Sequence, residues 1–311
     1  MSLHAARVLE NLNRQWQQLE NDLQVSFEFF PPNTPEMADT LWQSVLKLAR
    51  FKPQFVSVTY GANASTRDRT HAVIERLKTE TTLTPVPHLT CIDARRDEIA
   101  DIVRRYQKLG VNHIVALRGD LPPGQNHPGG DFAHAIDLVR YLRELGIDGI
   151  SVAAYPEVHP EARSARADLD HLKAKVDAGA SHILTQFFFD NVAFLRFRDR
   201  CEAAGIHVPI TPGILPIGNF RQVERFAKGC GTSIPDWLGR LYDGLDDDPD
   251  TRKLIGASVA LEQVKLLVKE GFRDFHFYTL NRAELTYAVC HSLGLANRPQ
   301  PATVLAQAAS L

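Results

Sequence analysis

The chain has 311 residues, of which 44% are hydrophobic and 23% charged, and these ordinary values exclude a wholly disordered protein. Its 35 Lys and Arg against 37 Asp and Glu give a net charge of −2, which argues against the large basic surface of a nucleic-acid-binding protein. No apolar run approaches the roughly 20 residues of a membrane span, and the N-terminus lacks the apolar core of a signal peptide. The four cysteines form no CxxC pair, which disfavours a disulfide framework and a zinc site. We therefore expect a cytoplasmic protein without a membrane or nucleic-acid partner.

Strand-like and helical segments alternate along the chain. A helical lead-in over 1–20 precedes the first β-rich run, and a helix follows that run from Thr34, which can serve as its N-cap. The acidic stretch 244–250 predicts another helix start, because acidic side chains suit a helix N-terminus. The strand-like runs span 24–30, 55–61, 86–92, 113–120, 150–157, 182–189, 208–215 and 274–280.

This alternation predicts a (β/α)8 TIM barrel. Strands that alternate with helices form a parallel sheet covered on both faces, and eight such units in about 250–300 residues match the barrel. A doubly wound sheet is the alternative, but it uses fewer strands, and no GxGxxG follows the first strand. We expect one barrel domain over 21–297, with a helical extension over 1–20 and a disordered tail over 298–311.

Polar residues gather where the predicted strands end. In a barrel, chemistry lies at the carboxyl ends of the strands and on the loops that follow them. Polar groups in buried strands cost free energy unless they have partners, so stability alone explains this placement poorly. The residues at these ends are Glu28, Thr59, His88, Arg118, Gly119, Asp120, Tyr155, His159, Gln186, Thr279 and Arg282.

Glu28 stands between Phe27 and Phe29 and has two interpretations. Desolvation among aromatic side chains favours the neutral form of a carboxyl group, as a general acid requires. The alternative is a solvent-facing side chain on an alternating strand. Asp120 is likewise either a functional carboxylate or a turn and ion-pair residue. No HExxH, HxxEH or Cys/His cluster occurs, so we expect no metal, and no strand-like run holds a Lys for Schiff-base chemistry.

Several long motifs occur in order over about residues 20–295. They are SFEFFPP (26–32), SVTYGA (57–62), HLTC (88–91), ALRGDLP (116–122), AAYPEVHPEA (153–162), TQFFFD (185–190), PGILP (212–216) and HFYTLNR (276–282). Together they resemble the methylenetetrahydrofolate reductase family in its bacterial form, which consists of the catalytic domain only. The resemblance implies a (β/α)8 barrel that binds FAD without a Rossmann fingerprint, in agreement with the missing GxGxxG.

The resemblance further implies a flavoprotein oxidoreductase of one-carbon metabolism and methionine biosynthesis. NADH or NADPH would bind over FAD, pass a hydride to N5 and leave, and 5,10-methylenetetrahydrofolate would then take its place and become 5-methyltetrahydrofolate. Glu28 would be the general acid that protonates N10 of the folate and opens its ring to a 5-iminium ion. Asp120 would lie near flavin and pterin, hold the folate and tune the flavin.

The other site residues follow from the matching motif positions. Thr59 would also lie near the nicotinamide, Gln186 would serve both folate and nicotinamide, and Phe226 would stack against the substrate. The flavin-contacting positions are Thr59, Tyr60, Ala62, His88, Arg118, Gly119, Asp120, Ala135, Tyr155, His159, Ala162, Asp168, His171, Ala174 and Lys175. The substrate-contacting positions are Asp120, Gln186, Gln222, Phe226 and Arg282.

Two other functions remain open. Another barrel flavoenzyme, such as a proline-dehydrogenase-like oxidase, would not turn over folate, and a silent folate- or flavin-binding protein would not be reduced by NAD(P)H. Glu28 and Asp120 argue against the silent protein. The choice between NADH and NADPH stays open, because no Rossmann acidic residue or arginine can be identified. Relatives commonly associate, so the resemblance is compatible with a homo-oligomer.

Overall fold

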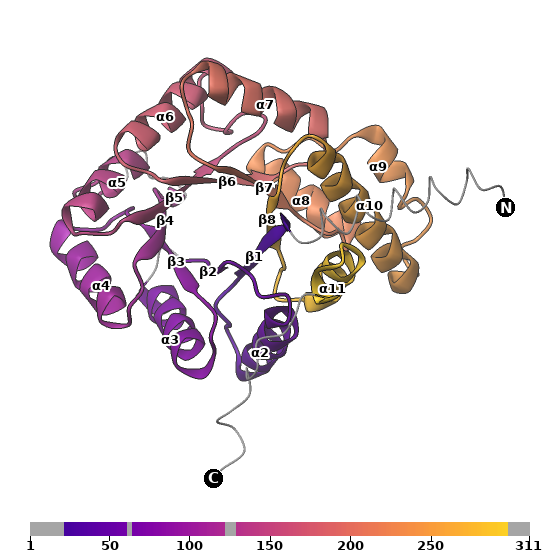
Figure 1. The fold of residues 1–311 in the computed structure, drawn as a ribbon, viewed down its shortest axis with the longest axis horizontal. Coiled ribbons are helices and arrows are strands. Elements are labelled where there is room, and N and C mark those ends of the chain that lie inside the picture. The colour runs from indigo at the N-terminus through magenta and orange to yellow at the C-terminus, as the bar shows by residue number, and fades with distance from the viewer. Residues whose placement is uncertain (1–21, 61–63, 122–128, 298–311) are drawn as a thin grey trace, which may run out of the picture.

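Eight parallel strands close into a barrel in which β8 pairs back onto β1 (Figure 1). The computed structural model describes residues 22–60, 64–121 and 129–297. The predicted (β/α)8 barrel is confirmed, and each strand ends slightly before its predicted run because the final residues leave the ladder and enter a loop. The strands are β1 Gln24–Phe29, β2 Val56–Val58, β3 Pro85–Thr90, β4 His113–Leu117, β5 Gly149–Ala154, β6 His182–Phe187, β7 Ile210–Ile214 and β8 Asp274–Tyr278.

Helices surround the barrel, and local capping explains where they begin (Figure 1). Thr34 accepts the N–H of Met37 at 3.3 Å and starts α2 as predicted. Asp248 accepts the N–H of Thr251 at 3.0 Å, so the acidic stretch does begin a helix. The helices are α2 Pro35–Ala49, α3 Ala64–Glu80, α4 Arg96–Lys108, α5 Ala135–Glu144, α6 Ala165–Asp177, α7 Asn191–Ala203, α8 Phe220–Cys230, α9 Asp236–Arg240, α10 Pro249–Lys269 and α11 Ala283–Ser292.

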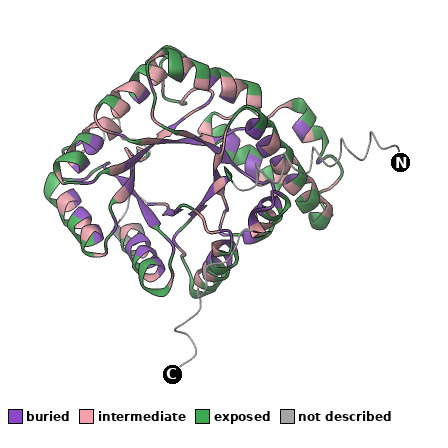
Figure 2. Cartoon of the chain, viewed as in Figure 1, coloured by how far each residue is buried: buried purple, intermediate pink, exposed green. Residues whose placement is uncertain are grey.

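The main core lies between the strands and the helices around them. Figure 2 shows buried strands and helices whose inner sides are buried while their outer sides are exposed. In β1, Val25, Phe27 and Phe29 belong to this outer core. Because successive side chains of a strand alternate, Ser26 and Glu28 face the inside of the barrel.

The barrel interior combines an apolar cluster with paired histidines. His113 Nε2 lies 2.7 Å from Ser151 Oγ, and His182 Nε2 lies 2.7 Å from Thr211 Oγ1. The Phe55 ring packs 5.6 Å from the His113 ring and 6.3 Å from the His182 ring. Burial lowers the pKa of each of these two histidines to about 4, so both are neutral at neutral pH. The apolar cluster consists of Phe55, Val86, Val115 and Leu184.

The pairing of β6 with β7 shifts register beside Gln186. Tyr278 Oη donates to the carbonyl oxygen of Thr185 at 2.8 Å, and Thr185 Oγ1 accepts the N–H of Gly213 at 2.9 Å. A Cβ at Gly213 would lie 2.7 Å from Tyr278 Cε2 and closer still to the Thr185 carbonyl oxygen, so only glycine fits. Such irregularities turn a side chain in a new direction, here next to a predicted substrate contact.

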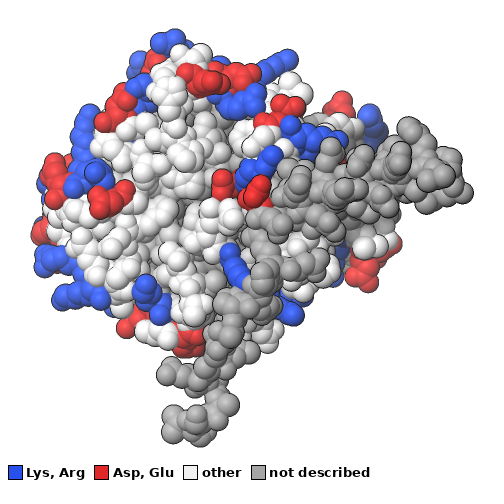
Figure 3. All heavy atoms as spheres, in the orientation of Figure 1, with Lys and Arg blue, Asp and Glu red and all other residues white. Residues whose placement is uncertain are grey.

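Two predicted segments lie outside the described residues: the helix over 1–20 and the tail over 298–311. Both stay predictions. Figure 3 shows many charged side chains around the edge of the viewed face and a largely uncharged area left of its centre. Within the described ranges, no helix combines the length and apolar character needed to cross a bilayer.

Candidate active site

Glu28 lies inside the barrel, close to the end of β1, and only 7% of its surface is exposed. Its Oε2 is 3.4 Å from His88 Nε2 and 3.7 Å from His276 Nε2. Neither nitrogen has a hydrogen-bond partner within the part of the chain that the structure describes. The solvent-facing interpretation of Glu28 is therefore wrong, because the polar positions of β1 face the barrel interior rather than water.

The two histidines beside Glu28 are held differently. Burial lowers the pKa of His88, although the charge of Glu28 acts in the opposite direction. His88 is therefore neutral at neutral pH and does not form a fixed ion pair with the carboxylate. His276 is fully buried, and its Nδ1 lies 2.7 Å from Ser26 Oγ, which orients the other ring nitrogen toward Glu28. A buried carboxyl group between two imidazoles can hold a proton away from bulk water and deliver it at one defined place.

The residues after β4 form one side of the barrel mouth. Arg118 Nη2 pairs with Glu161 Oε2 at 2.7 Å, which ties the end of β4 to the loop after β5. Gly119 has φ +92°, and a Cβ there would lie 2.7 Å from a side-chain carbon of the loop after β3. Asp120 is exposed. Burial raises the pKa of Cys230 and the Asp120 charge adds to this effect, so α8 ends near this carboxylate.

The loop after β5 and helix α6 form the next side. The His159 N–H donates to Asp168 Oδ2 at 2.9 Å, and the His159 ring lies 4.5 Å from the Tyr155 ring. Lys175 Nζ donates to the carbonyl oxygen of Ala153 at 2.7 Å. Burial lowers the pKa of Lys175 to about 8, while Asp168 acts in the opposite direction. This lysine, one of the predicted flavin contacts, therefore reaches the end of β5 from the following helix.

The predicted substrate contacts come from three elements. Burial raises the pKa of Tyr155 to about 12, and a side-chain hydrogen bond with Gln186 opposes this shift, so the ends of β5 and β6 are linked. Gln222 is half-buried on α8, and Phe226 lies one turn further along with 38% of its surface exposed. Arg282 is exposed at the N-cap of α11. These side chains stand at or after the carboxyl ends of β6, β7 and β8.

Several predicted flavin contacts lie toward α5 and α6, away from Glu28. Ala135 is the first residue of α5, and Ala162 donates its N–H to the His159 carbonyl oxygen at 2.9 Å in the loop before α6. Ala174 and His171 lie on α6, where the exposed His171 ring is 6.1 Å from His134. Ala62 falls outside the described residues.

The described residues fit a dinucleotide such as FAD. Thr90 Oγ1 is buried without a hydrogen-bond partner among the described residues, so it can bind a ligand's polar atom. The Tyr60 ring, in contrast, packs 6.0 Å from the His71 ring in the core between the strands and the helices. Thr59 closes the end of β2 by donating its N–H to the Phe29 carbonyl oxygen at 3.0 Å. Arg118 and Lys175 offer two cations for a pyrophosphate. This donor set would hold the phosphates and the flavin edge on the β2 to β5 side.

Sequence reasoning assigned no role to His276 and Tyr278, although both stand in HFYTLNR. Burial raises the pKa of Tyr278 well above its ordinary value, and the Glu28 charge adds to the effect, so this ring also lies near the carboxyl group. The available signal was alternation: Phe275 and Phe277 face the outer core, which leaves the polar residues of β8 facing inward.

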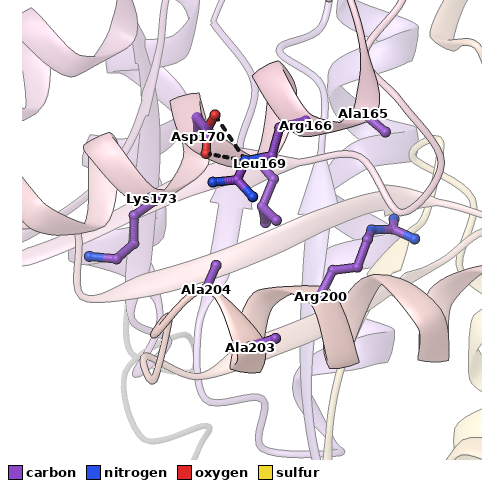
Figure 4. A pocket seen from close by; sticks show the side chains of 8 residues that line it. All are labelled: Ala165, Arg166, Leu169, Asp170, Lys173, Arg200, Ala203 and Ala204. Carbon is purple, nitrogen blue, oxygen red and sulfur yellow. Dashed lines mark hydrogen bonds and ion pairs between the residues drawn. The ribbon is translucent and has the colours of Figure 1, made fainter.

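A depression of about 450 Å³ lies elsewhere, between α6 and α7. Figure 4 shows Arg166 turned toward Asp170, while Lys173 and Arg200 stand at opposite ends, so the three cations do not converge on one ligand position. None of the predicted site residues lines this depression. Across the described ranges, no group of three His, Cys, Asp or Glu side chains is arranged to hold a metal ion.

Comparison with known proteins gives consistent matches. A model of the methylenetetrahydrofolate reductase family matches residues 12–294. The chain is 57% identical to the 5,10-methylenetetrahydrofolate reductase of Salmonella typhimurium, over 95% of this chain and 99% of that protein. The Escherichia coli reductase is 56% identical over the same shares. Methylenetetrahydrofolate reductase (NADH) 1 of Arabidopsis thaliana is 37% identical, over 87% of this chain and 48% of that protein.

Solved structures share the barrel. An uncharacterized protein from Clostridium thermocellum, which binds two copies of 5-methyl-5,6,7,8-tetrahydrofolic acid, has a TM-score of 0.59 at 14% identity, over 90% of this chain and 98% of that one. A dihydropteroate synthase from Coxiella burnetii, in complex with pteroic acid, has a TM-score of 0.51 at 12% identity, over 89% and 94% of the two chains. At these identities the likeness shows the fold alone.

Proposed function

Because the chain belongs to the methylenetetrahydrofolate reductase family, we propose that it reduces 5,10-methylenetetrahydrofolate to 5-methyltetrahydrofolate with NADH or NADPH through FAD. The two substrates use one place in turn, which makes the reaction ping-pong. FAD, when bound, supplies the hydride carrier between them. This function belongs to one-carbon metabolism and methionine biosynthesis in the cytoplasm.

Glu28 carries this proposal. Opening the five-membered ring of the folate requires a proton on N10, and Glu28 is a buried carboxyl group at the strand ends with Oε2 3.4 Å from His88 Nε2. Its burial leaves little of the carboxyl group in contact with water. Hydride transfer from the nicotinamide needs no such proton, so Glu28 acts in the folate half of the reaction only.

The other residues bind and orient the reactants. The exposed Arg282 guanidinium suits the carboxylates of a folate tail, and Phe226 offers a ring for its aromatic part. Gln186, half-buried at the end of β6, binds pterin or nicotinamide in turn. Asp120 would border the bound flavin and folate, and Arg118 and Lys175 would hold the pyrophosphate. Binding each reactant beside the cofactor in this way would make each transfer effectively intramolecular.

The test is the absorbance spectrum of the purified protein followed by two half-reactions. We expect a yellow protein whose flavin is released on denaturation, is bleached anaerobically by NADH or NADPH, and regains its colour with 5,10-methylenetetrahydrofolate. A colourless protein that takes up no added FAD would contradict the proposal. A flavin that is reduced but not reoxidised by folate would favour another barrel flavoenzyme.

A further inference from the structure

The loop between β8 and α11 is hydrogen-bonded to the end of β1 through an asparagine side chain. Asn281 Oδ1 accepts the N–H of Phe30 at 2.8 Å, and Asn281 Nδ2 donates to the carbonyl oxygen of Phe30 at 2.9 Å. The regular pairing of β1 with β8 stops at Glu28 opposite Tyr278. The amide of Asn281 therefore takes the place of a peptide group and extends this ladder past the last strand residue.

A second contact from the same loop holds Glu28 itself. Thr279 Oγ1 donates to the Glu28 carbonyl oxygen at 2.6 Å and in turn accepts the N–H of Asn281 at 3.1 Å. The backbone of Glu28 and that of Phe30 are thus both bonded to residues 279–281. The main chain that carries the Glu28 carboxyl group is consequently fixed at the Glu28 carbonyl and again two residues further on.

The backbone of this loop is unfavourable for ordinary residues. Leu280 has φ +50° and Asn281 has φ +58°. Residues other than glycine rarely adopt this left-handed region of the backbone. Asn281 is 9% exposed, and both ends of its amide are bonded to Phe30. Backbone conformations of this kind persist where the surroundings determine them strongly, and they cluster at functional sites.

We propose that Asn281 is a positioning residue that fixes Glu28 for proton delivery and sets the start of α11, where Arg282 is exposed. This inference rests on the proposed function. Through Phe30 and Thr279, Asn281 holds the strand that carries the acid, and the next residue is the N-cap of α11. One side chain thereby couples the position of the proton donor to that of the cation proposed for the folate tail.

Two variants separate the amide from the backbone conformation. Asn281→Gly permits the left-handed backbone but removes both bonds to Phe30, whereas Asn281→Asp keeps the acceptor for the Phe30 N–H and loses the donor. Ser44→Ala is the matched control, because Ser44 Oγ donates to the Asn281 carbonyl oxygen at 2.9 Å from α2 and takes no part in the bonds to Phe30. Each FAD-loaded protein is examined by hydrogen exchange at the Phe30 amide and by the two half-reactions.

We expect the Phe30 amide to exchange at least about tenfold faster in Asn281→Gly, with a smaller change in Asn281→Asp. Reoxidation by methylenetetrahydrofolate should slow on the order of 10–100-fold in Asn281→Gly, since small misplacements of a reacting group cost about that much. Reduction by NAD(P)H should stay within about threefold in every variant, and Ser44→Ala should resemble the wild type throughout.

The results distinguish the two proposals. If wild type itself is not reoxidised by folate, the proposed function fails whatever the variants do. If wild type turns over and Asn281→Gly reoxidises equally fast, or if Ser44→Ala slows reoxidation as much, Asn281 does not position Glu28. Should the Gly variant fail to fold, Asn281→Asp decides, and wild-type reoxidation in that variant would overturn the inference.

Discussion

At the scale of single residues, the proton of Glu28 distinguishes the two halves of the reaction. Glu28→Gln keeps the size of the side chain between His88 and His276 but cannot donate an acidic proton, so the barrel should survive. Loss of a general acid typically costs roughly 10²–10⁴-fold. In stopped-flow experiments we expect reduction by NADH or NADPH within about tenfold of wild type, while reoxidation by methylenetetrahydrofolate nearly stops.

The control for this variant is Glu80→Gln, which makes the same change in an exposed pair with Arg76 on α3. It should leave both half-reactions unchanged. Near wild-type reoxidation in Glu28→Gln would show that another group, such as Asp120 or a bound water, supplies the proton.

Which residues matter could be predicted from the sequence more readily than where they point. The expectation that aromatic neighbours surround the Glu28 carboxyl group is wrong, because Phe27 and Phe29 lie in the outer core and Glu28 faces the barrel interior. Alternation separates these residues, but period two does not say whether the polar face meets water or a barrel interior. That distinction depends on strand closure, a property of the whole sheet. The same limit hid His276, whose partners Ser26 and Glu28 are about 250 residues away in sequence.

At the scale of elements, the junction of β6, β7 and β8 depends on the absence of a side chain at Gly213. Gly213→Ala would place a Cβ 2.7 Å from Tyr278 Cε2 and closer to the Thr185 carbonyl oxygen, where backbone must move. Overpacking of this kind costs typically about 1–3 kcal/mol. We expect this loss in the free energy of unfolding measured with urea, together with weaker folate binding because Gln186 adjoins the junction.

Gly229→Ala provides the matched comparison, because a Cβ at this position in α8 would meet no atom within 4 Å. Replacing an unconstrained helical glycine should stabilise the protein by roughly 0.5 kcal/mol. Equal effects of the two substitutions would mean that the β6–β7 junction adjusts without cost and does not hold Gln186.

Element types and helix starts were predictable because their causes are local. Thr34 and Asp248 cap helices through bonds to residues three positions ahead. The loop after β8 was not predictable in the same way, since Asn281 bonds to Phe30 across 251 residues of sequence. Its two left-handed residues carry no glycine that would mark the turn.

At the scale of the whole molecule, the eight repeated strand–helix units predict the barrel, but they do not predict which polar side chains pair inside it. His113 and His182 occupy the interior with Ser151 and Thr211 as partners, and each pair joins neighbouring strands. In the sequence, both histidines are isolated residues at the starts of strands. Only closure brings them around Phe55, where desolvation keeps them neutral.

The two buried histidines should make the free energy of unfolding depend on pH. Burial lowers the pKa of His113 and His182 to about 4 in the folded protein, whereas an unfolded histidine titrates near about 6.5. As pH falls below about 6.5, these two histidines bind protons in the unfolded chain but stay neutral in the folded barrel. The stability that the two neutral histidines add to the folded state is therefore fully present above that pH. It is lost progressively toward pH 4, by at most on the order of 3 kcal/mol per ring.

The measurement is the free energy of urea unfolding between pH 7 and pH 5, where most carboxyl groups stay ionised. Wild type should lose stability across this window, and the variant His113→Gln/His182→Gln should be less stable at pH 7 but lose less on acidification, because two proton-binding sites of the unfolded chain are gone. His207→Gln, at an exposed position, should keep the wild-type slope. An unchanged slope in the double variant would mean that the interior histidines take up protons while folded, and that the barrel admits charge where its geometry suggests a neutral core.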